Sequence, residues 1–97
     1  MRLDGKTALV TGADSGIGQA IATEFAMAGA DVAITFHSDR DGAGETTRLI
    51  EEQGRRAAVF QLDVRDPHAV QNTFDAARDA LGCIDILVNN AGKGMGE

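Results

Sequence analysis

Residues 7–18 read TALVTGADSGIG, a β-rich run that passes through three glycines into a helical pattern. The run over residues 7–11 predicts a strand that ends at Gly12. From about Ser15 the apolar side chains recur with the spacing of one helix face, at Ile17, Ile21, Phe25 and Ala28. Gly29 is suited to end that helix, because glycine adopts the left-handed conformation at little cost. The stretch therefore predicts a strand joined to a helix by a short glycine-rich turn.

The rest of the chain alternates between the same two patterns. Further strands are predicted over residues 32–36, 57–61 and 84–88. Further helices are predicted over residues 43–53 and 67–81. The first of these helices should turn Thr47 and Ile50 inward, and the second should begin at Asp66-Pro67 and end at Gly82. Because the strands are apolar throughout, we expect an α/β fold whose parallel sheet is covered by helices on both faces.

The composition excludes several classes of protein. The 97 residues carry a net charge of −6, and the cationic side chains form no stripe that would neutralise a nucleic-acid backbone. No apolar run approaches the roughly 20 residues of a membrane helix, and the N-terminus lacks the apolar segment of a signal peptide. The single cysteine, Cys83, fits a reducing compartment. We therefore expect a cytoplasmic protein that binds neither nucleic acid nor membrane, and no residue spacing predicts a metal site.

The glycine cluster at the first strand–helix junction predicts a phosphate-binding turn. Such a turn directs unpaired backbone N–H groups and the positive end of the helix to one point. We expect Gly12 to permit the sharp turn, Gly16 to let a diphosphate approach the backbone, and Gly18 to let the helix lie close to the sheet. Asp14 and Ser15 have side chains able to reach the loop or a ribose. An ATPase-type loop is excluded because no Lys-Ser or Lys-Thr pair follows Gly18, which leaves a tight turn without ligand as the alternative.

Four short motifs resemble those of the short-chain dehydrogenase/reductase family, in the same order along the chain. Residues 11–18 match its T-G-x-x-x-G-x-G pattern, and residues 89–92 match its N-N-A-G. Asp63-Val64 and Asp85 stand where the family has matching residues, after the third strand and before the fourth. The resemblance covers nearly the whole chain and implies the N-terminal, cofactor-binding half of such an enzyme. The implied fold is a Rossmann-like, doubly wound parallel sheet, truncated to four strands in the order 3-2-1-4, with three helices.

The resemblance also implies a set of cofactor-binding residues. Members of the first glycine cluster match positions around the pyrophosphate and adenine ribose: Gly12, Asp14, Ser15, Gly16, Ile17 and Gly18. Asp63 and Val64 match positions that flank the adenine, with the carboxylate toward the exocyclic amine. The positions that match the lining of the nicotinamide-side ribose are Asn90, Ala91 and Gly92. Two alternatives stay open, that Asn90 only pins the sheet and that Asp63 only caps a turn.

The residues after the second strand bear on the choice between NADP and NAD. An NAD site usually has Asp or Glu about 20 residues after the glycine turn, where it binds the ribose 2′-OH. Here Phe36 ends the strand and cannot do so. His37, Ser38 and Arg40 suit a 2′-phosphate, because charge-assisted hydrogen bonds to phosphate are strong. Asp39 is the counter-argument, since it would repel that phosphate or reach a 2′-OH. We predict NADP rather than NAD, with a solvated loop histidine as the alternative for His37.

The resemblance implies hydride transfer between the nicotinamide and a small alcohol or carbonyl substrate. Carbonyl reduction needs a proton donor near the forming alkoxide. The family supplies it from a serine and a Tyr-x-x-x-Lys pair downstream of N-N-A-G. The 97 residues contain no tyrosine, so we assign no catalytic residue and do not expect this chain alone to turn over. The alternative is a stand-alone nucleotide-binding or regulatory module, whereas the glycine spacing argues against a flavodoxin-like domain.

The expected organisation is a dinucleotide-binding half-domain over residues 1–92 and a flexible tail over residues 93–97. The fourth strand would then lie at an edge of the sheet without the neighbour that covers it. An exposed strand edge and an uncovered apolar face favour association. We therefore expect a homo-oligomer, or association with a missing C-terminal half.

Overall fold

The computed structural model describes residues 2–91, in which four strands alternate with three helices. The strands are β1 (Thr7–Val10), β2 (Asp31–Phe36), β3 (Ala57–Gln61) and β4 (Ile86–Val88). The helices are α1 (Gly16–Met27), α2 (Arg40–Glu52) and α3 (Pro67–Leu81). All strands are parallel and form one sheet in the order β3-β2-β1-β4, so the predicted fold class and strand order are confirmed. Gly92 and the predicted tail over residues 93–97 lie outside the described residues.

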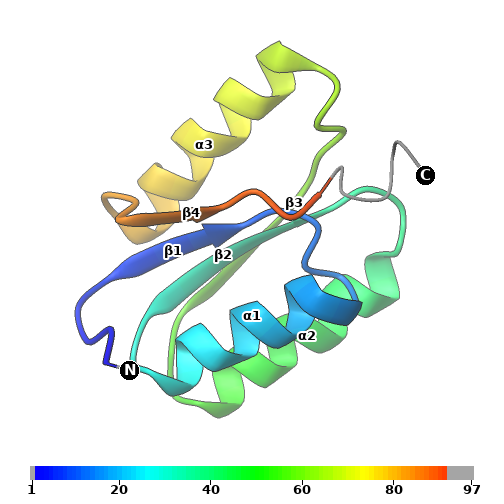
Figure 1. The fold of residues 1–97 in the computed structure, drawn as a ribbon. Helices are drawn as coiled ribbons and strands as arrows, with labels where there is room; N and C mark the ends of the chain where they lie inside the picture. Colours follow the sequence, from blue (N-terminus) through cyan, green and yellow to red (C-terminus); the bar gives the residue numbers. More distant parts are fainter. Residues whose placement is uncertain (1, 92–97) are drawn as a thin grey trace.

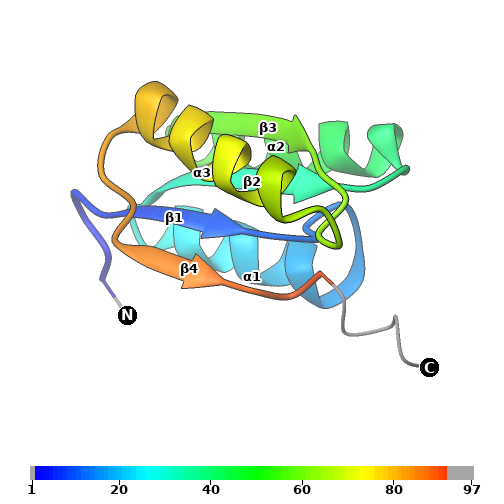
Figure 2. The same ribbon diagram turned by 90° about the horizontal axis from the view of Figure 1, so that it is seen from above.

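Helices cover both faces of the sheet, because each crossover between parallel strands is made by a helix. α1 and α2 lie on one face and α3 lies on the other (Figures 1 and 2). The larger core fills the space between the sheet and the α1–α2 layer and includes Val10, Ile34 and Ile50. A smaller core under α3 consists of Leu9, Ala33, Ala77 and Leu81. Both faces of β1 and β2 are buried, which explains why apolar residues do not alternate with polar ones there.

The buried face of α1 differs from the predicted one. Ile17 begins the predicted apolar stripe, but its side chain is 61% exposed. The buried residues of the helix are instead Gly18, Ala22 and Ala26. Small side chains let the helix approach the sheet closely, and a Cβ on Gly18 would lie only 2.2 Å from the carbonyl oxygen of Gly12. The stripe prediction was wrong for Ile17, whereas Ile21 and Phe25 are partly buried and pack against the core as expected. The closest contact with the sheet selects for small size rather than for hydrophobicity.

The start of α2 also differs from the prediction. The helix begins at Arg40, three residues early, because Asp39 is its N-cap and accepts a 2.9 Å hydrogen bond from the amide of Gly42. Gly42 lies against the first glycine loop, where an added Cβ would be 2.2 Å from the carbonyl oxygen of Asp14. The fully buried threonine of α2 is Thr46 rather than Thr47.

The start of α3 agrees with the prediction. Asp66 is the N-cap, and one oxygen of its carboxylate accepts hydrogen bonds from the amides of His68 (3.0 Å) and Ala69 (3.2 Å). Pro67 is the first residue of the helix, where its missing N–H removes no hydrogen bond. Gly82 ends the helix with a φ of 98°, a conformation that favours glycine.

Strand β4 is shorter than the predicted range and begins at Ile86. At Asp85 a side-chain contact stands in place of regular pairing, because the carboxylate accepts a 2.9 Å hydrogen bond from the amide of Thr7. The amide of Asp85 in turn donates to the carbonyl of Thr7 at 2.8 Å. Asp85 therefore fixes where β4 begins its pairing with β1.

A buried ion cluster ties the sheet together at the edge opposite the glycine loop. Asp31 begins β2 and is only 7% exposed. Its carboxylate accepts hydrogen bonds from the backbone amide and the Nε of Arg56, each at 3.0 Å, and lies 2.9 Å from the guanidinium of Arg55. Arg56 also donates to the carbonyl of Leu81 at 3.1 Å, which links the cluster to the end of α3.

Candidate functional site

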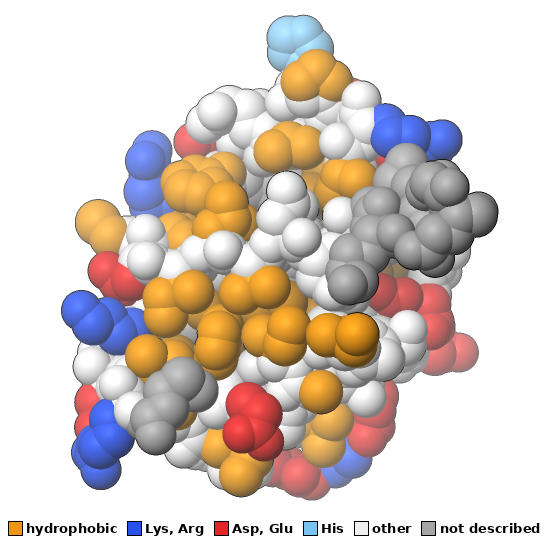
Figure 3. All heavy atoms as spheres, viewed as in Figure 1, with side chains coloured by type: hydrophobic (Ala, Val, Ile, Leu, Met, Phe, Trp, Pro, Cys, Tyr) orange, Lys and Arg blue, Asp and Glu red, His pale blue; other side chains and the backbone are white. Residues whose placement is uncertain are grey.

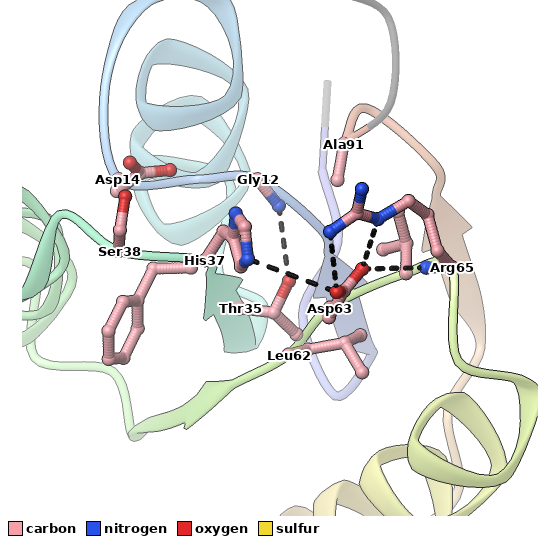
Figure 4. A pocket seen from close by; sticks show the side chains of 11 residues that line it. Gly12, Asp14, Thr35, His37, Ser38, Leu62, Asp63, Arg65 and Ala91 are labelled. Carbon is pink, nitrogen blue, oxygen red and sulfur yellow. Dashed lines mark hydrogen bonds and ion pairs between the residues drawn. The ribbon is translucent and has the colours of Figure 1, made fainter. Parts of the chain in front are cut away.

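Four loops meet at the carboxyl edge of the sheet, because parallel strands all end on the same side. They follow β1, β2, β3 and β4, and between them lies a pocket of about 330 Å³ (Figure 4). The side chains and backbone that line it belong to Gly12, Asp14, Thr35, Phe36, His37, Ser38, Leu62, Asp63, Val64, Arg65 and Ala91. The fold thus brings the ends of all four strands to one cavity.

Most of the site residues expected from the sequence lie in or beside this pocket. Those that line it are Gly12, Asp14, His37, Ser38, Asp63, Val64 and Ala91. Those that do not line it are Ser15, Gly16, Ile17, Gly18 and Asn90. Gly92 is outside the described part of the chain. The binding role of each of these residues stays a prediction.

Sequence reasoning missed four lining residues, Thr35, Phe36, Leu62 and Arg65. Phe36, Leu62 and Arg65 each adjoin a predicted site residue and Thr35 lies two residues from His37, so including the neighbours of every strand end would have found them. Arg65 matters most, because it brings a positive charge into a pocket whose glycine loop contains none.

The glycine loop makes a sharp turn between β1 and α1. Gly12 has a φ of 64°, and an added Cβ would lie 2.9 Å from the Cα of Ala91, so only glycine fits. Gly16 has a φ of 59° and nothing lies within 4 Å of the place its Cβ would take. Ser15 is the N-cap of α1, but its side chain makes no capping hydrogen bond. The start of α1 is therefore open to solvent at Gly16.

The amide of Gly12 is not one of the unpaired N–H groups that the sequence predicts for this turn. That amide donates to the Oγ1 of Thr35 at 3.1 Å, and the amide of Ala13 donates to the carbonyl of Thr35 at 2.9 Å. Among residues 2–91, no hydrogen-bond acceptor is found for the amides from Asp14 to Gly18. The unpaired donors are thus those of the helix start, two residues further along than expected.

The residues after β4 are tied to the glycine turn. The Oγ1 of Thr11 accepts hydrogen bonds from the amides of Asn90 and Ala91, both at 3.0 Å. The side-chain amide of Asn90 donates to the carbonyl of Gly12 at 3.0 Å. Asn90 therefore pins β4 to the turn, as the structural alternative proposed, while Ala91 faces the pocket.

The carboxylate of Asp63 is paired with Arg65 and lies near His37 in the pocket wall. Its Oδ1 accepts from the amide and the Nε of Arg65, both at 3.0 Å, and its Oδ2 accepts from Nη2 at 2.9 Å. The Nε2 of His37 lies 4.0 Å from the same Oδ2. Hydrogen bonds from the Arg65 side chain and backbone lower the pKa of Asp63 far below its usual value, so the carboxylate is ionised at neutral pH. Asp63 both caps the turn at Arg65 and presents an anion to the pocket (Figure 4).

The end of β2 forms the opposite wall. His37 and Ser38 are exposed at its surface. The guanidinium of Arg40 lies over the ring of Phe36, 5.2 Å from the ring centre. The carboxylate of Asp39 is engaged as the cap of α2. The pocket therefore offers the ionised carboxylate of Asp63 and the guanidinium of Arg65, and the helix start with its unpaired amides follows Asp14 of the pocket wall. These groups suit a ligand with phosphate groups and an amine donor, such as a nucleotide.

Comparison with known proteins identifies relatives of this chain. The family model described as short chain dehydrogenase matches residues 6–97. The 3beta-hydroxysteroid dehydrogenase 1 of Eggerthella lenta is 48% identical over 90 residues, which is 93% of this chain and 34% of that protein. A short chain dehydrogenase from Burkholderia cenocepacia in complex with NADP is 52% identical with a TM-score of 0.92, over 95% of this chain and 38% of that one. Carveol dehydrogenase from Mycobacterium avium in complex with NAD is 34% identical with a TM-score of 0.89, over 94% and 37%.

The strand order and the helices on both faces define a Rossmann-like α/β protein. The chain belongs to the short-chain dehydrogenase family. It spans about a third of the length of the curated relatives it matches. The solved relatives include complexes with NADP and with NAD, so the family relation supports a nicotinamide cofactor without choosing between the two.

Residues 2–91 contain neither a metal-binding cluster nor a membrane-spanning helix. Within residues 2–91, no group of three or more His, Cys, Asp or Glu side chains is placed to hold a metal ion. In the same part of the chain, no helix has the length and apolar character that a membrane crossing requires.

Proposed function

We propose that this chain forms the cofactor-binding part of an NADP(H)-dependent oxidoreductase that transfers hydride between the nicotinamide and a small alcohol or carbonyl substrate. The observation that carries this proposal is the single pocket in which the glycine loop meets the ends of β2, β3 and β4. Family membership supports the reaction class. The unpaired amides from Asp14 to Gly18 supply the anion-binding end of α1 for the diphosphate.

The ends of β3 and β4 are proposed to bind the two nucleosides. Asp63 has three hydrogen bonds from Arg65, two on Oδ1 and one on Oδ2, so Oδ2 has room for a donor such as the adenine amine. Val64 lies beside it on the pocket wall. Ala91, with Asn90 and Gly92, would flank the nicotinamide-side ribose.

The preference for NADP over NAD is supported by the charges around the end of β2. Asp39 was the counter-argument, but its carboxylate accepts the amide of Gly42 and caps α2, which holds it away from a ribose 2′-OH. His37 and Ser38 are exposed at the pocket, and Arg65 lines its other wall. A 2′-phosphate at the end of β2 would therefore meet the side chains of His37 and Ser38, which can donate hydrogen bonds to it.

A second candidate function is nucleotide binding without catalysis. The sequence contains no tyrosine, so this chain alone lacks the proton donor that the family uses, and we propose that it does not turn over. We also propose that residues 1–92 act as one nucleotide-binding unit in the cytoplasm.

The proposed unit has an exposed apolar edge. β4 lies at the border of the sheet and its Leu87 is 56% exposed. Figure 3 shows hydrophobic side chains gathered across the middle of the face that holds β4 and α1. An uncovered strand edge beside apolar side chains supports self-association or association with further polypeptide.

The cofactor proposal predicts a preference that can be measured on the 97-residue chain. Titration with NADPH and NADH, followed by nicotinamide fluorescence, should show weak binding with NADPH about tenfold tighter, because charge-assisted contacts to the 2′-phosphate are absent for NADH. Ser38→Asp should remove that preference by placing a carboxylate beside the phosphate, while the uncharged Ser38→Asn should keep it. Equal or tighter binding of NADH by the unaltered chain would overturn the NADP assignment.

A further inference from the structure

Two buried threonines of the second β-α unit make hydrogen bonds to the backbone of the glycine loop. Thr35 of β2 is 1% exposed and Thr46 of α2 is 0% exposed. Both lie more than twenty residues away from the loop in sequence, and neither belongs to the motifs that identify the family. Buried hydroxyl groups need hydrogen-bond partners, and these two find theirs on the backbone of the loop.

Thr35 holds the first two amides of the loop. Its Oγ1 accepts the amide of Gly12 at 3.1 Å, and its carbonyl accepts the amide of Ala13 at 2.9 Å. These two bonds turn both amides toward the sheet. The amides that follow, from Asp14 to Gly18, have no acceptor among residues 2–91.

Thr46 holds the next carbonyl of the loop. Its Oγ1 lies 2.6 Å from the carbonyl oxygen of Ala13 and accepts a 2.8 Å hydrogen bond from the side-chain amide of Gln19. A hydroxyl group has one proton, which the shorter contact assigns to Ala13 rather than to the carbonyl of Gly42 at 3.1 Å. One hydroxyl therefore joins α2, the loop and the first turns of α1.

We propose that Thr35 and Thr46 are positioning residues that hold the glycine loop in its anion-receiving conformation, and that they affect the diphosphate of the ligand rather than its adenine. This inference rests on the proposed function. The physical reason is preorganisation, since a loop already fixed in the bound shape has less conformational freedom to lose when the diphosphate arrives.

The test compares two ligands on the 97-residue chain. ADP-ribose contains the diphosphate, and adenosine lacks it. Thr35→Val and Thr46→Val keep the side-chain shape and remove the hydroxyl. Each should weaken ADP-ribose binding by about tenfold, while adenosine binding, followed by NMR titration, should change by less than about twofold. Thr35→Ser and Thr46→Ser should restore ADP-ribose binding. Thr47→Val is the control, because its hydroxyl bonds only the carbonyl of Ala43 in its own helix.

Amide hydrogen exchange gives a second measurement that needs no ligand. In Thr35→Val the amide of Gly12 loses its acceptor and should exchange at least about tenfold faster. The amide of Ala13 bonds the main chain of residue 35, so its exchange rate should stay the same and serves as an internal reference.

Several outcomes would overturn the inference. They are an equal loss of ADP-ribose and adenosine binding, unchanged ADP-ribose binding in both valine variants, and an unchanged exchange rate at Gly12. If the unaltered chain bound no ADP-ribose, the proposed function and its diphosphate role would fail together. The exchange rates would still decide whether the threonines hold the loop.

Discussion

Gly18→Ala is expected to destabilise the chain by about 2–3 kcal/mol, because the core has no room for the added methyl group. The new Cβ would lie 2.2 Å from the carbonyl oxygen of Gly12 and 2.6 Å from the side-chain nitrogen of Asn90. α1 would have to move away from the sheet, and its open N-terminus would move with it. ADP-ribose binding should therefore fall by at least about tenfold in the same variant.

Gly44→Ala is the matched control for this substitution. Gly44 lies in the interior of α2, and nothing lies within 4 Å of the place its Cβ would take. Alanine there should stabilise the chain by roughly 0.5–1 kcal/mol, because it restricts the unfolded chain and favours the helix. Urea unfolding followed by circular dichroism measures both effects. A Gly18→Ala chain as stable as the unaltered one would show that α1 does not pack on the loop in this way.

Asp31→Asn is expected to destabilise the chain by about 2–3 kcal/mol at pH 7, because it removes a buried charge that two arginines satisfy. Asp31 accepts hydrogen bonds from Arg56 and lies 2.9 Å from Arg55, and the side chains of Arg55 and Arg56 are themselves only partly exposed. Asp79→Asn is the control, since that carboxylate is exposed on α3, and its effect should stay within about 0.5 kcal/mol.

The effect of Asp31→Asn should depend on pH. Burial alone would raise the pKa of Asp31, but the hydrogen bonds from Arg56 and the charges of both arginines outweigh it and lower that pKa below its usual value. Because the pKa of Asp31 is lower in the folded chain than in the unfolded chain, where it is about 3.9, the ionised carboxylate contributes its full stabilisation above about pH 3.9. That contribution is lost as the pH falls through the pKa of the folded state. The difference between the two chains in urea unfolding should therefore shrink from pH 7 to pH 3. A difference that stayed constant would contradict the role of the carboxylate charge.

Much of the fold could be predicted from short stretches of sequence. The strand β3 over Ala57–Gln61 and the cap of α3 at Asp66 were predicted correctly, because an apolar run and an Asp-Pro pair act through contacts a few residues away. Parallel pairing followed from the alternation of strands and helices. These features depend on local backbone preferences and on periodicity, which a sequence carries directly.

The errors came from one contact between segments that are distant in sequence and from one helix cap that was overlooked. The buried face of α1 is set by the close approach of Gly18 to Gly12 and Asn90, so the larger Ile17 is displaced to the surface. The early start of α2 reflects the cap at Asp39, although Gly42 weakens helix formation there. In α1 close packing of backbones outweighed the local preference, whereas in α2 the cap at Asp39 outweighed the low helix propensity of Gly42.

The sequence by itself determined the class of this chain, since the glycine cluster and the N-N-A-G stretch lie at strand ends whose carboxyl edges must coincide in a parallel sheet. Only the tertiary structure decided which donors remain unpaired at the pocket. The amide of Gly12 is bonded to Thr35, and Arg65 is brought against Asp63 on the pocket wall. Hydrogen bonding depends on the position and direction of both partners, and those are fixed only when separate β-α units pack together.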